Sequence, residues 1–173
     1  MQIQEDILKK TSILIDKKNY KEVQSILLKF IKENNNIKID VKVYYLLYLS
    51  CEALKENKSA KKYLEKCIKI NNKNHIALNN LANIYLKEGN VLKAEKFYLR
   101  SLDSKKDYLI VIINLAIFYQ DTGKLEEANK FYLKAINLSP KKISIYFNLS
   151  RIDKNFINKE KLEFLLDIMR NEK

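Results

Sequence analysis

The chain has 173 residues, 47% of them hydrophobic, with only two glycines and one proline. This length is enough for one well-buried domain, and the scarcity of glycine and proline favours helices joined by short turns. The first ten residues include Glu5 and Asp6 among scattered apolar side chains. We therefore expect neither a signal peptide nor a membrane span and take a cytoplasmic location as the default, with the earlier removal of a leader left open.

The formal net charge is +12, which is compatible with a nucleic-acid or membrane-surface partner. Arginine binds phosphates and bases more specifically than lysine does, yet it occurs only at Arg100, Arg151 and Arg170. The charge by itself is therefore weak evidence about partners.

The first predicted hairpin spans about residues 3–36, with a helix on each side of a turn at Lys18-Asn19. Its second helix carries Val23 where later hairpins carry alanine. Terminal repeats are commonly atypical because they cap a stack, so we interpret this hairpin as a degenerate first repeat.

Three more hairpins are predicted over about residues 40–73, 75–106 and 109–140, the first of them beginning at Asp40, a suitable N-cap. The last two contain one pattern twice at a spacing of 34 residues. The recurring pairs are Leu81 and Leu115, Ala82 and Ala116, Tyr85 and Tyr119, Gly89 and Gly123, Ala94 and Ala128, and Tyr98 and Tyr132. A period of this length, with small residues returning as small and tyrosines as tyrosines, indicates a helical repeat protein.

A fifth hairpin is predicted over about residues 142–171, but the glycine turn is missing and the last helix is expected over about 158–171. The residues expected to pack are Leu162, Leu165, Leu166 and Met169. Phe164 and Ile168 fall on the far side of this helix. They either pack against the preceding repeat or a bent C-terminus, or they form a self-association surface that would make a homodimer.

The fourth hairpin resembles the tetratricopeptide repeat family almost throughout. The matching residues are Asn114, Leu115, Ala116, Tyr119, Gly123, Ala128, Tyr132, Ala135 and Pro140. The resemblance implies an all-α fold, a right-handed superhelical stack of about five antiparallel helix-turn-helix hairpins forming a single domain over residues 1–173. It also implies that the first helices of successive hairpins line a concave groove.

Solvent-facing positions of these first helices are the natural partner-binding residues. From the repeat register they are Tyr45, Leu49, Asn79, Asn83, Ile110, Ile113, Ile117, Phe147 and Arg151. Ile113 and Ile117 lie at the centre of an apolar strip, which either is covered by the chain's own termini or binds a partner. We expect a non-enzymatic adaptor or scaffold whose groove holds a peptide or helix of a protein partner.

A basic stripe on the second helix of hairpin two offers an alternative. Its members follow one another by three or four residues and are Lys58, Lys62, Lys66, Lys69 and Lys73. The stripe is either a solvated outer face or a site for RNA or another anionic surface. Tyr63 is the one interleaved aromatic residue, so base stacking has little support.

The sequence contains no pattern that predicts catalysis. Cys51 and Cys67 lack metal-ligand spacing and read as buried small side chains, and His75 is the only histidine. No glycine-rich phosphate loop or paired histidines are present. We therefore expect no catalytic residues, no metal site and no cofactor.

Overall fold

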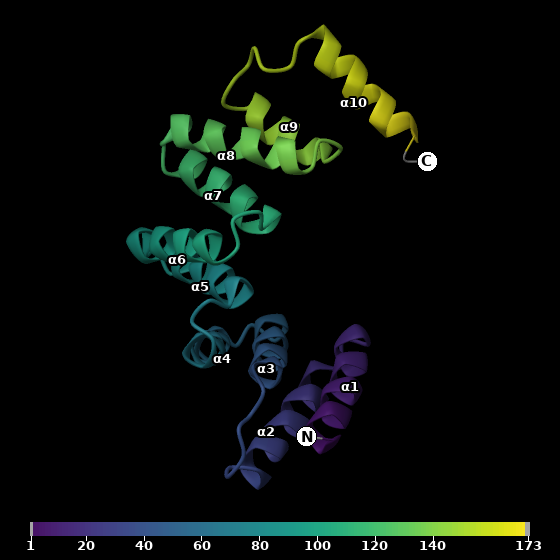
Figure 1. Ribbon diagram of the computed structural model, residues 1–173, viewed down its shortest axis with the longest axis vertical. Helices are drawn as coiled ribbons and strands as arrows, with labels where there is room; N and C mark the ends of the chain where they lie inside the picture. Colours follow the sequence, from purple (N-terminus) through teal and green to yellow (C-terminus); the bar gives the residue numbers. More distant parts are fainter. Residues whose placement is uncertain (1, 172–173) are drawn as a thin grey trace. The chain divides into compact units, whose positions relative to one another are not determined.

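The computed structural model describes residues 2–171, and over that range the chain forms ten α-helices and no strand (Figure 1). The helices are α1 (Gln2–Asp16), α2 (Tyr20–Glu33), α3 (Val41–Ala53), α4 (Asn57–Ile70), α5 (His75–Lys87), α6 (Val91–Ser104), α7 (Leu109–Asp121), α8 (Leu125–Leu138), α9 (Ile143–Ser150) and α10 (Lys159–Asn171). The predicted all-helical repeat fold is confirmed. The chain divides into two compact units, Met1–Phe97 and Tyr98–Lys173, with the boundary inside α6.

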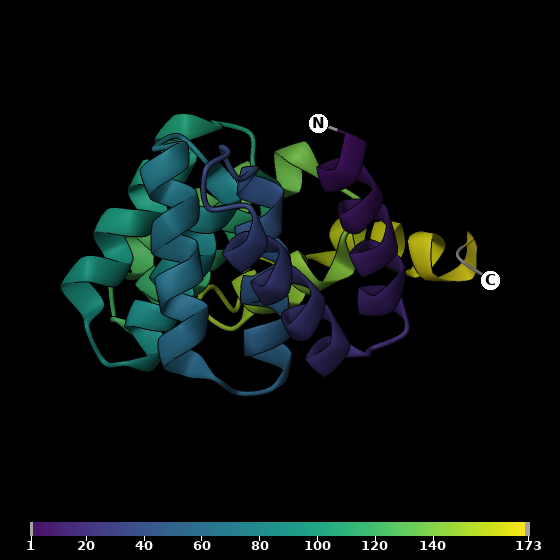
Figure 2. The same cartoon turned by 90° about the horizontal axis from the view of Figure 1, so that it is seen from below.

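The first four hairpins share one turn in which a single residue adopts a left-handed backbone conformation. The four residues are Lys18 (φ 58°), Lys55 (φ 61°), Gly89 (φ 74°) and Gly123 (φ 77°). In each turn the next residue donates its backbone N–H to a carbonyl five residues earlier, as in the bond of 2.8 Å from Asn90 to Tyr85. This hydrogen bond is that of the Schellman motif, and the second helix begins within a few residues of the turn. The two helices of a hairpin therefore run antiparallel, as Figure 2 shows for α1 and α2.

Small residues allow the paired helices to approach closely. Ala60, Ala94 and Ala128, which occupy the same place in the repeat, are all nearly or completely buried. Val23 is buried at the corresponding place in α2, so the degenerate first hairpin keeps the same inward position with a larger side chain.

The first unit has a core at its N-terminal end that joins α2 to α3. Its buried members are Val23, Leu27, Phe30, Val43 and Leu47. Partly buried residues of α1, including Ile7, Leu8 and Leu14, pack against this cluster. The first helix is therefore fixed by its apolar side, and its other side faces solvent.

In the second unit, aromatic rings fill the space between the helices. Tyr98 and Phe118 lie 5.8 Å apart, and Tyr119 stacks on Phe131 at 5.6 Å, both measured between ring centroids. The Tyr132 hydroxyl donates a hydrogen bond of 2.8 Å to the Gln120 side-chain oxygen, so its buried polar group is satisfied.

The packed face of α10 was predicted wrongly. Leu165 and Ile168 are buried and form a cluster with Tyr146, whereas Leu162, Leu166 and Met169 remain 49%, 41% and 56% exposed. The helix carries apolar residues on two neighbouring faces, and periodicity alone does not say which of them meets the preceding repeat.

None of the described helices has both the length and the apolar character needed to cross a bilayer.

Candidate partner-binding surfaces

A groove with a volume of about 730 Å³ lies between α1 and α3 in the first unit. Its lining residues are Glu5, Leu8, Lys9, Ser12 and Ile13 of α1, and Lys42, Tyr45 and Leu46 of α3. Leu8 and Leu46 form the floor, because they also pack against the buried core. Ile13 is 56% exposed and stands at the rim, where it offers apolar surface to a partner.

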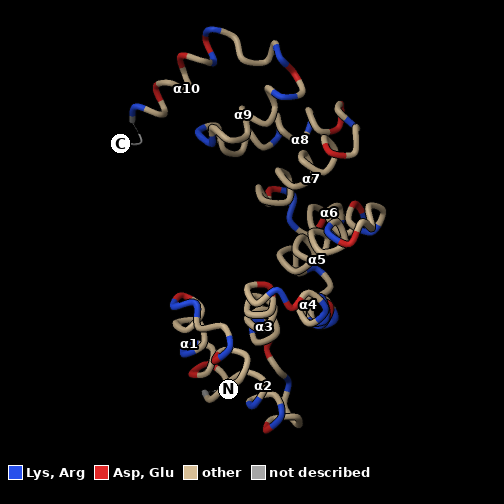
Figure 3. The backbone as a smooth tube through the Cα atoms, turned by 180° about the vertical axis from the view of Figure 1, so that it is seen from behind, with Lys and Arg blue, Asp and Glu red and all other residues tan. Residues whose placement is uncertain are grey.

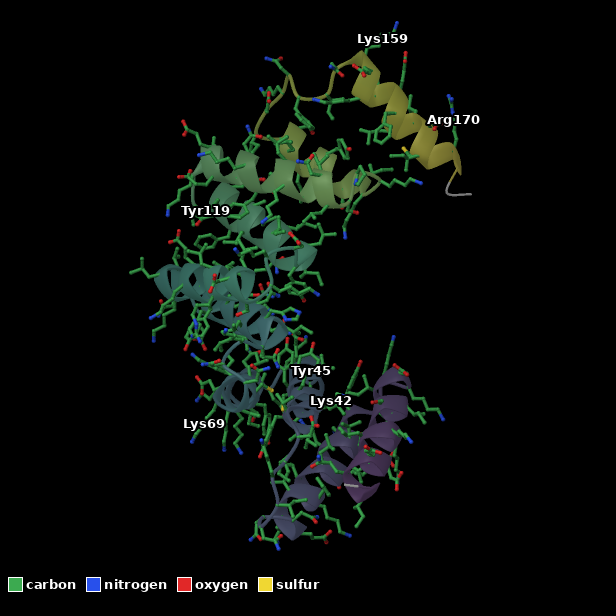
Figure 4. The ribbon with its side chains drawn as sticks, viewed as in Figure 1. Lys42, Tyr45, Lys69, Tyr119, Lys159 and Arg170 are labelled. Carbon is green, nitrogen blue, oxygen red and sulfur yellow. The ribbon has the colours of Figure 1, made fainter. Side chains whose placement is uncertain are left out.

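Local interactions at the start of α3 hold the two walls of this groove. The Asp40 side chain accepts a hydrogen bond of 2.7 Å from the backbone N–H of Lys42 and thereby caps α3, as its sequence position predicted. The backbone N–H of Asp40 in turn donates to the side-chain oxygen of Gln4 on α1 at 3.3 Å. The two helices are thus tied together beside the groove, where Figure 4 labels Lys42 and Tyr45 on α3.

Of the predicted groove residues in the first unit, Tyr45 lines the α1–α3 groove and Leu49 is half-buried on the same helix. Asn83 is also half-buried, but Asn79 is only 2% exposed, so its assignment as a solvent-facing residue was wrong. The start of α5 is enclosed on several sides, since Ala77 and Leu78 are completely buried there as well. The position of Asn79 within the repeat does not predict this burial.

In the second unit the predicted residues lie on α7 and α9, except Arg151, which directly follows α9. Ile113 and Ile117 are half-buried, so they offer less surface than expected for the centre of a binding strip. Ile110 and Phe147 are 52% and 66% exposed, and Arg151 is exposed. The large accessible apolar surface here therefore belongs to Ile110 and Phe147.

The lysine stripe forms one basic side of α4, which Figure 3 shows nearly end-on. Lys58, Lys62, Lys69 and Lys73 are exposed and Lys66 is half-buried. Among the described residues, none of these five lysines forms an ion pair. In this described part of the chain, the basic side of α4 thus holds no salt bridge of its own, and Glu65 is the one acidic residue within the helix.

Tyr44 of α3 lies next to this basic side. The sequence did not predict that Tyr44 is close to the lysines. The Tyr44 ring stacks on Tyr63 with centroids 6.5 Å apart, and the Lys66 ammonium nitrogen lies 4.9 Å from the Tyr44 centroid. Tyr44, Lys66, Lys69 and Ile70 surround a hollow of about 220 Å³. Tyr44 stands on a different helix from the lysines, so helical spacing within α4 did not reveal it.

Both cysteines are buried, which is consistent with their interpretation as small core residues. Burial raises the pKa of the Cys51 thiol to about 11 and that of Cys67 to about 12, so both are protonated and unreactive near neutral pH. Within residues 2–171 there is no group of three or more histidine, cysteine or acidic side chains that could hold a metal ion.

Two family profiles match the chain, both described as tetratricopeptide repeat, one over residues 41–74 and one over residues 74–141. The chain belongs to the tetratricopeptide repeat family. The resemblance drawn from the fourth hairpin is confirmed, and the tetratricopeptide repeats extend without a gap from the start of α3 to the end of α8.

Several solved structures have a fold similar to that of this chain. A MamA RS-1 double mutant has a TM-score of 0.79 at 14% identity, covering 98% of this chain and 96% of the MamA chain. PilF of Pseudomonas aeruginosa has a TM-score of 0.79 at 14% identity, covering 98% and 76%. BtubC from P. vanneervenii has a TM-score of 0.75 at 18% identity, covering 96% and 78%. These identities establish the fold alone, and no curated protein sequence matches the chain.

Within the tetratricopeptide architecture, α1 and α3 are first helices of successive hairpins and α4 is a second helix. The α1–α3 groove therefore occupies the kind of surface that the family resemblance assigned to partners, whereas the lysine stripe lies on the other helix of its hairpin. The family supports a protein-interaction scaffold role in general terms.

Proposed function

We propose that this protein is a non-enzymatic interaction scaffold that holds a helical or extended segment of a protein partner in the α1–α3 groove. The observation that carries the proposal is the groove itself, with its apolar floor and charged rim. Its volume of about 730 Å³ is within the range of roughly 300–1,000 Å³ that binding pockets occupy.

The rim indicates what kind of segment fits. Leu8, Ile13, Tyr45 and Leu46 accept apolar anchor side chains, as in the insertion of an amphipathic helix into a groove. The rim carries two cations, Lys9 and Lys42, and one anion, Glu5. A partner segment with one or two apolar anchors and neighbouring acidic residues therefore matches the groove best.

The test is affinity capture from native lysate with three versions of the protein. The groove variant combines Ile13→Glu with Lys42→Glu, two exposed positions that leave the core intact. The matched control is Leu92→Glu, since Leu92 is 81% exposed on α6 of the same unit. We expect one protein to bind the parent and the control at least about tenfold more strongly than it binds the groove variant. Equal recovery from all three versions would refute the groove as the contact surface.

We propose that the second unit contributes contacts through the exposed residues Ile110, Phe147 and Arg151 and the half-buried residues Ile113 and Ile117. Accessible apolar side chains and a cation are suited to a partner segment that combines apolar and acidic residues. Ile110→Glu should weaken capture of the same protein, and unchanged capture would limit binding to the first unit.

RNA binding by the basic side of α4 is a second candidate, favoured by the position of Tyr44 among Lys66 and Lys69. An aromatic ring beside unpaired cations is the combination that single-stranded nucleic acid uses. Binding of a poly(U) oligonucleotide should fall steeply with rising salt, and the triple substitution of Lys62, Lys69 and Lys73 by alanine should abolish it. The control substitutes Lys87, Lys130 and Lys154, which are exposed elsewhere, so the change in net charge is identical. Negligible binding even at low salt excludes this candidate.

A further inference from the structure

One side of α10 carries three large apolar side chains that the fold leaves exposed. Leu162, Leu166 and Met169 are 49%, 41% and 56% exposed and follow one another at helical spacings of four and three residues. We refer to them as the outer strip. We propose that the outer strip is a homodimer interface, at which α10 pairs antiparallel with α10 of a second copy of this chain. This proposal does not depend on the α1–α3 groove.

The outer strip is separate from the side of α10 that serves the fold. Leu165 and Ile168 are buried and pack with Tyr146 in a cluster with Phe156 and Ile157. Successive residues of a helix are rotated by about 100°, so Leu162, Leu166 and Met169 point in one common direction, away from Ile168. The outer strip can therefore meet another molecule without unpacking α10.

The charges beside the outer strip are self-complementary. Glu163 and Arg170 are seven residues apart and therefore lie along the same edge of the strip, about two turns from each other. In an antiparallel pair with its two-fold axis near Leu166, Glu163 of each copy faces Arg170 of the other copy. Two opposite-charge pairs result. In a parallel two-fold pair, the edge that carries Glu163 and Arg170 lies across from the opposite edge of the other copy, so these two residues would not face each other. The two opposite-charge pairs therefore favour the antiparallel arrangement.

The same axis also brings the apolar side chains together. Leu166 meets its own counterpart, and Leu162 meets Met169 of the second copy. Residue i contacts residue j while j contacts i, as an isologous two-fold interface requires. Figure 4 shows α10 with Lys159 at its start and Arg170 near its end, so Arg170 and the strip occupy the same exposed helix.

The dimer should be weak. A helix of 13 residues is about 20 Å long, and two such helices bury less than the roughly 1,200–2,000 Å² of a stable interface. We therefore expect a dissociation constant of tens of micromolar, and the measurement must reach protein concentrations of about 500 μM.

Sedimentation equilibrium of the full chain, at protein concentrations from about 5 to 500 μM, tests the proposal. Leu166→Glu places two like charges at the centre and should leave only monomer, whereas Leu92→Glu, on α6, should dimerise as the parent does. Glu163→Arg and Arg170→Glu should each weaken dimerisation at least about tenfold. The double variant Glu163→Arg/Arg170→Glu should restore it, because the two pairs re-form with their charges exchanged.

Circular dichroism establishes that each variant keeps its helices. A parent that stays monomeric at the highest concentration overturns the proposal. Dimerisation of Leu166→Glu equal to that of the parent places the contact elsewhere and also overturns it. A charge-swapped double variant that fails to recover rejects the antiparallel pairing.

Discussion

Replacement of Lys55 by glycine should stabilise the protein. Lys55 has φ 61° in the turn between α3 and α4, whereas Gly89 and Gly123 occupy the corresponding place in the next two hairpins. A residue with a Cβ atom loses about 1–2 kcal/mol in the left-handed conformation. Glycine costs roughly 0.5–1 kcal/mol through the greater freedom of the unfolded chain. The difference predicts a net gain of about 0.5–1 kcal/mol.

Urea unfolding followed by far-ultraviolet circular dichroism measures this change in the free energy of unfolding. For a chain of this size the gain corresponds to a rise in melting temperature of about 1–4 °C. Lys55→Ala is the matched control, because it removes the same side chain but keeps a Cβ atom, and its stability should stay within about 0.5 kcal/mol of the parent. Gly89→Ala should lose about 1 kcal/mol, although its added Cβ meets no atom within 4 Å. A Lys55→Gly variant no more stable than Lys55→Ala would refute the argument that backbone strain decides this position.

Three further predictions concern buried polar groups. Tyr132→Phe removes the hydrogen bond to Gln120 and should lower the free energy of unfolding by about 0.5–1.5 kcal/mol in the same urea assay, with an unchanged value contradicting the bond. Burial raises the pKa of Cys51 to about 11 and that of Cys67 to about 12. Both thiols should therefore react with a thiol reagent at pH 8 at least about 100-fold more slowly in the native than in the denatured protein. Comparable rates in the two states would show that the thiols are accessible. Burial also raises the pKa of Tyr98 and Tyr132 from 10.0 to about 12. As the pH rises from 10 to 12, these two hydroxyls lose their protons in the unfolded chain before they do so in the folded protein, so the free energy of unfolding should fall. A constant free energy of unfolding over that range would contradict the shifts.

The amino-acid sequence alone determined the repeat architecture of this protein. The spacing of 34 residues between recurring alanines, tyrosines and glycines requires successive hairpins, because each such pattern places small residues where two helices meet. Ala94 and Ala128 are accordingly buried, and Gly89 and Gly123 adopt the left-handed turn. These features depend on neighbours within about one hairpin, which is why the sequence reveals them.

Only the tertiary structure decided which apolar faces remain open. Periodicity shows that a helix has an apolar side, but it does not show what lies against that side. Leu166 is therefore exposed where burial was expected, and Ile168, for which packing and self-association were both left open, is buried. Asn79 is buried among neighbouring core residues, and its position in the repeat did not predict this burial.

The candidate sites required contacts between residues far apart in the chain. The α1–α3 groove joins Ile13 to Tyr45, and the basic side of α4 gains Tyr44 beside Lys66. Such pairs are formed by the packing of one helix on another, so no pattern within a single helix predicts them. The repeat was thus readable from the sequence, whereas the surfaces it presents to partners were set by how its helices pack.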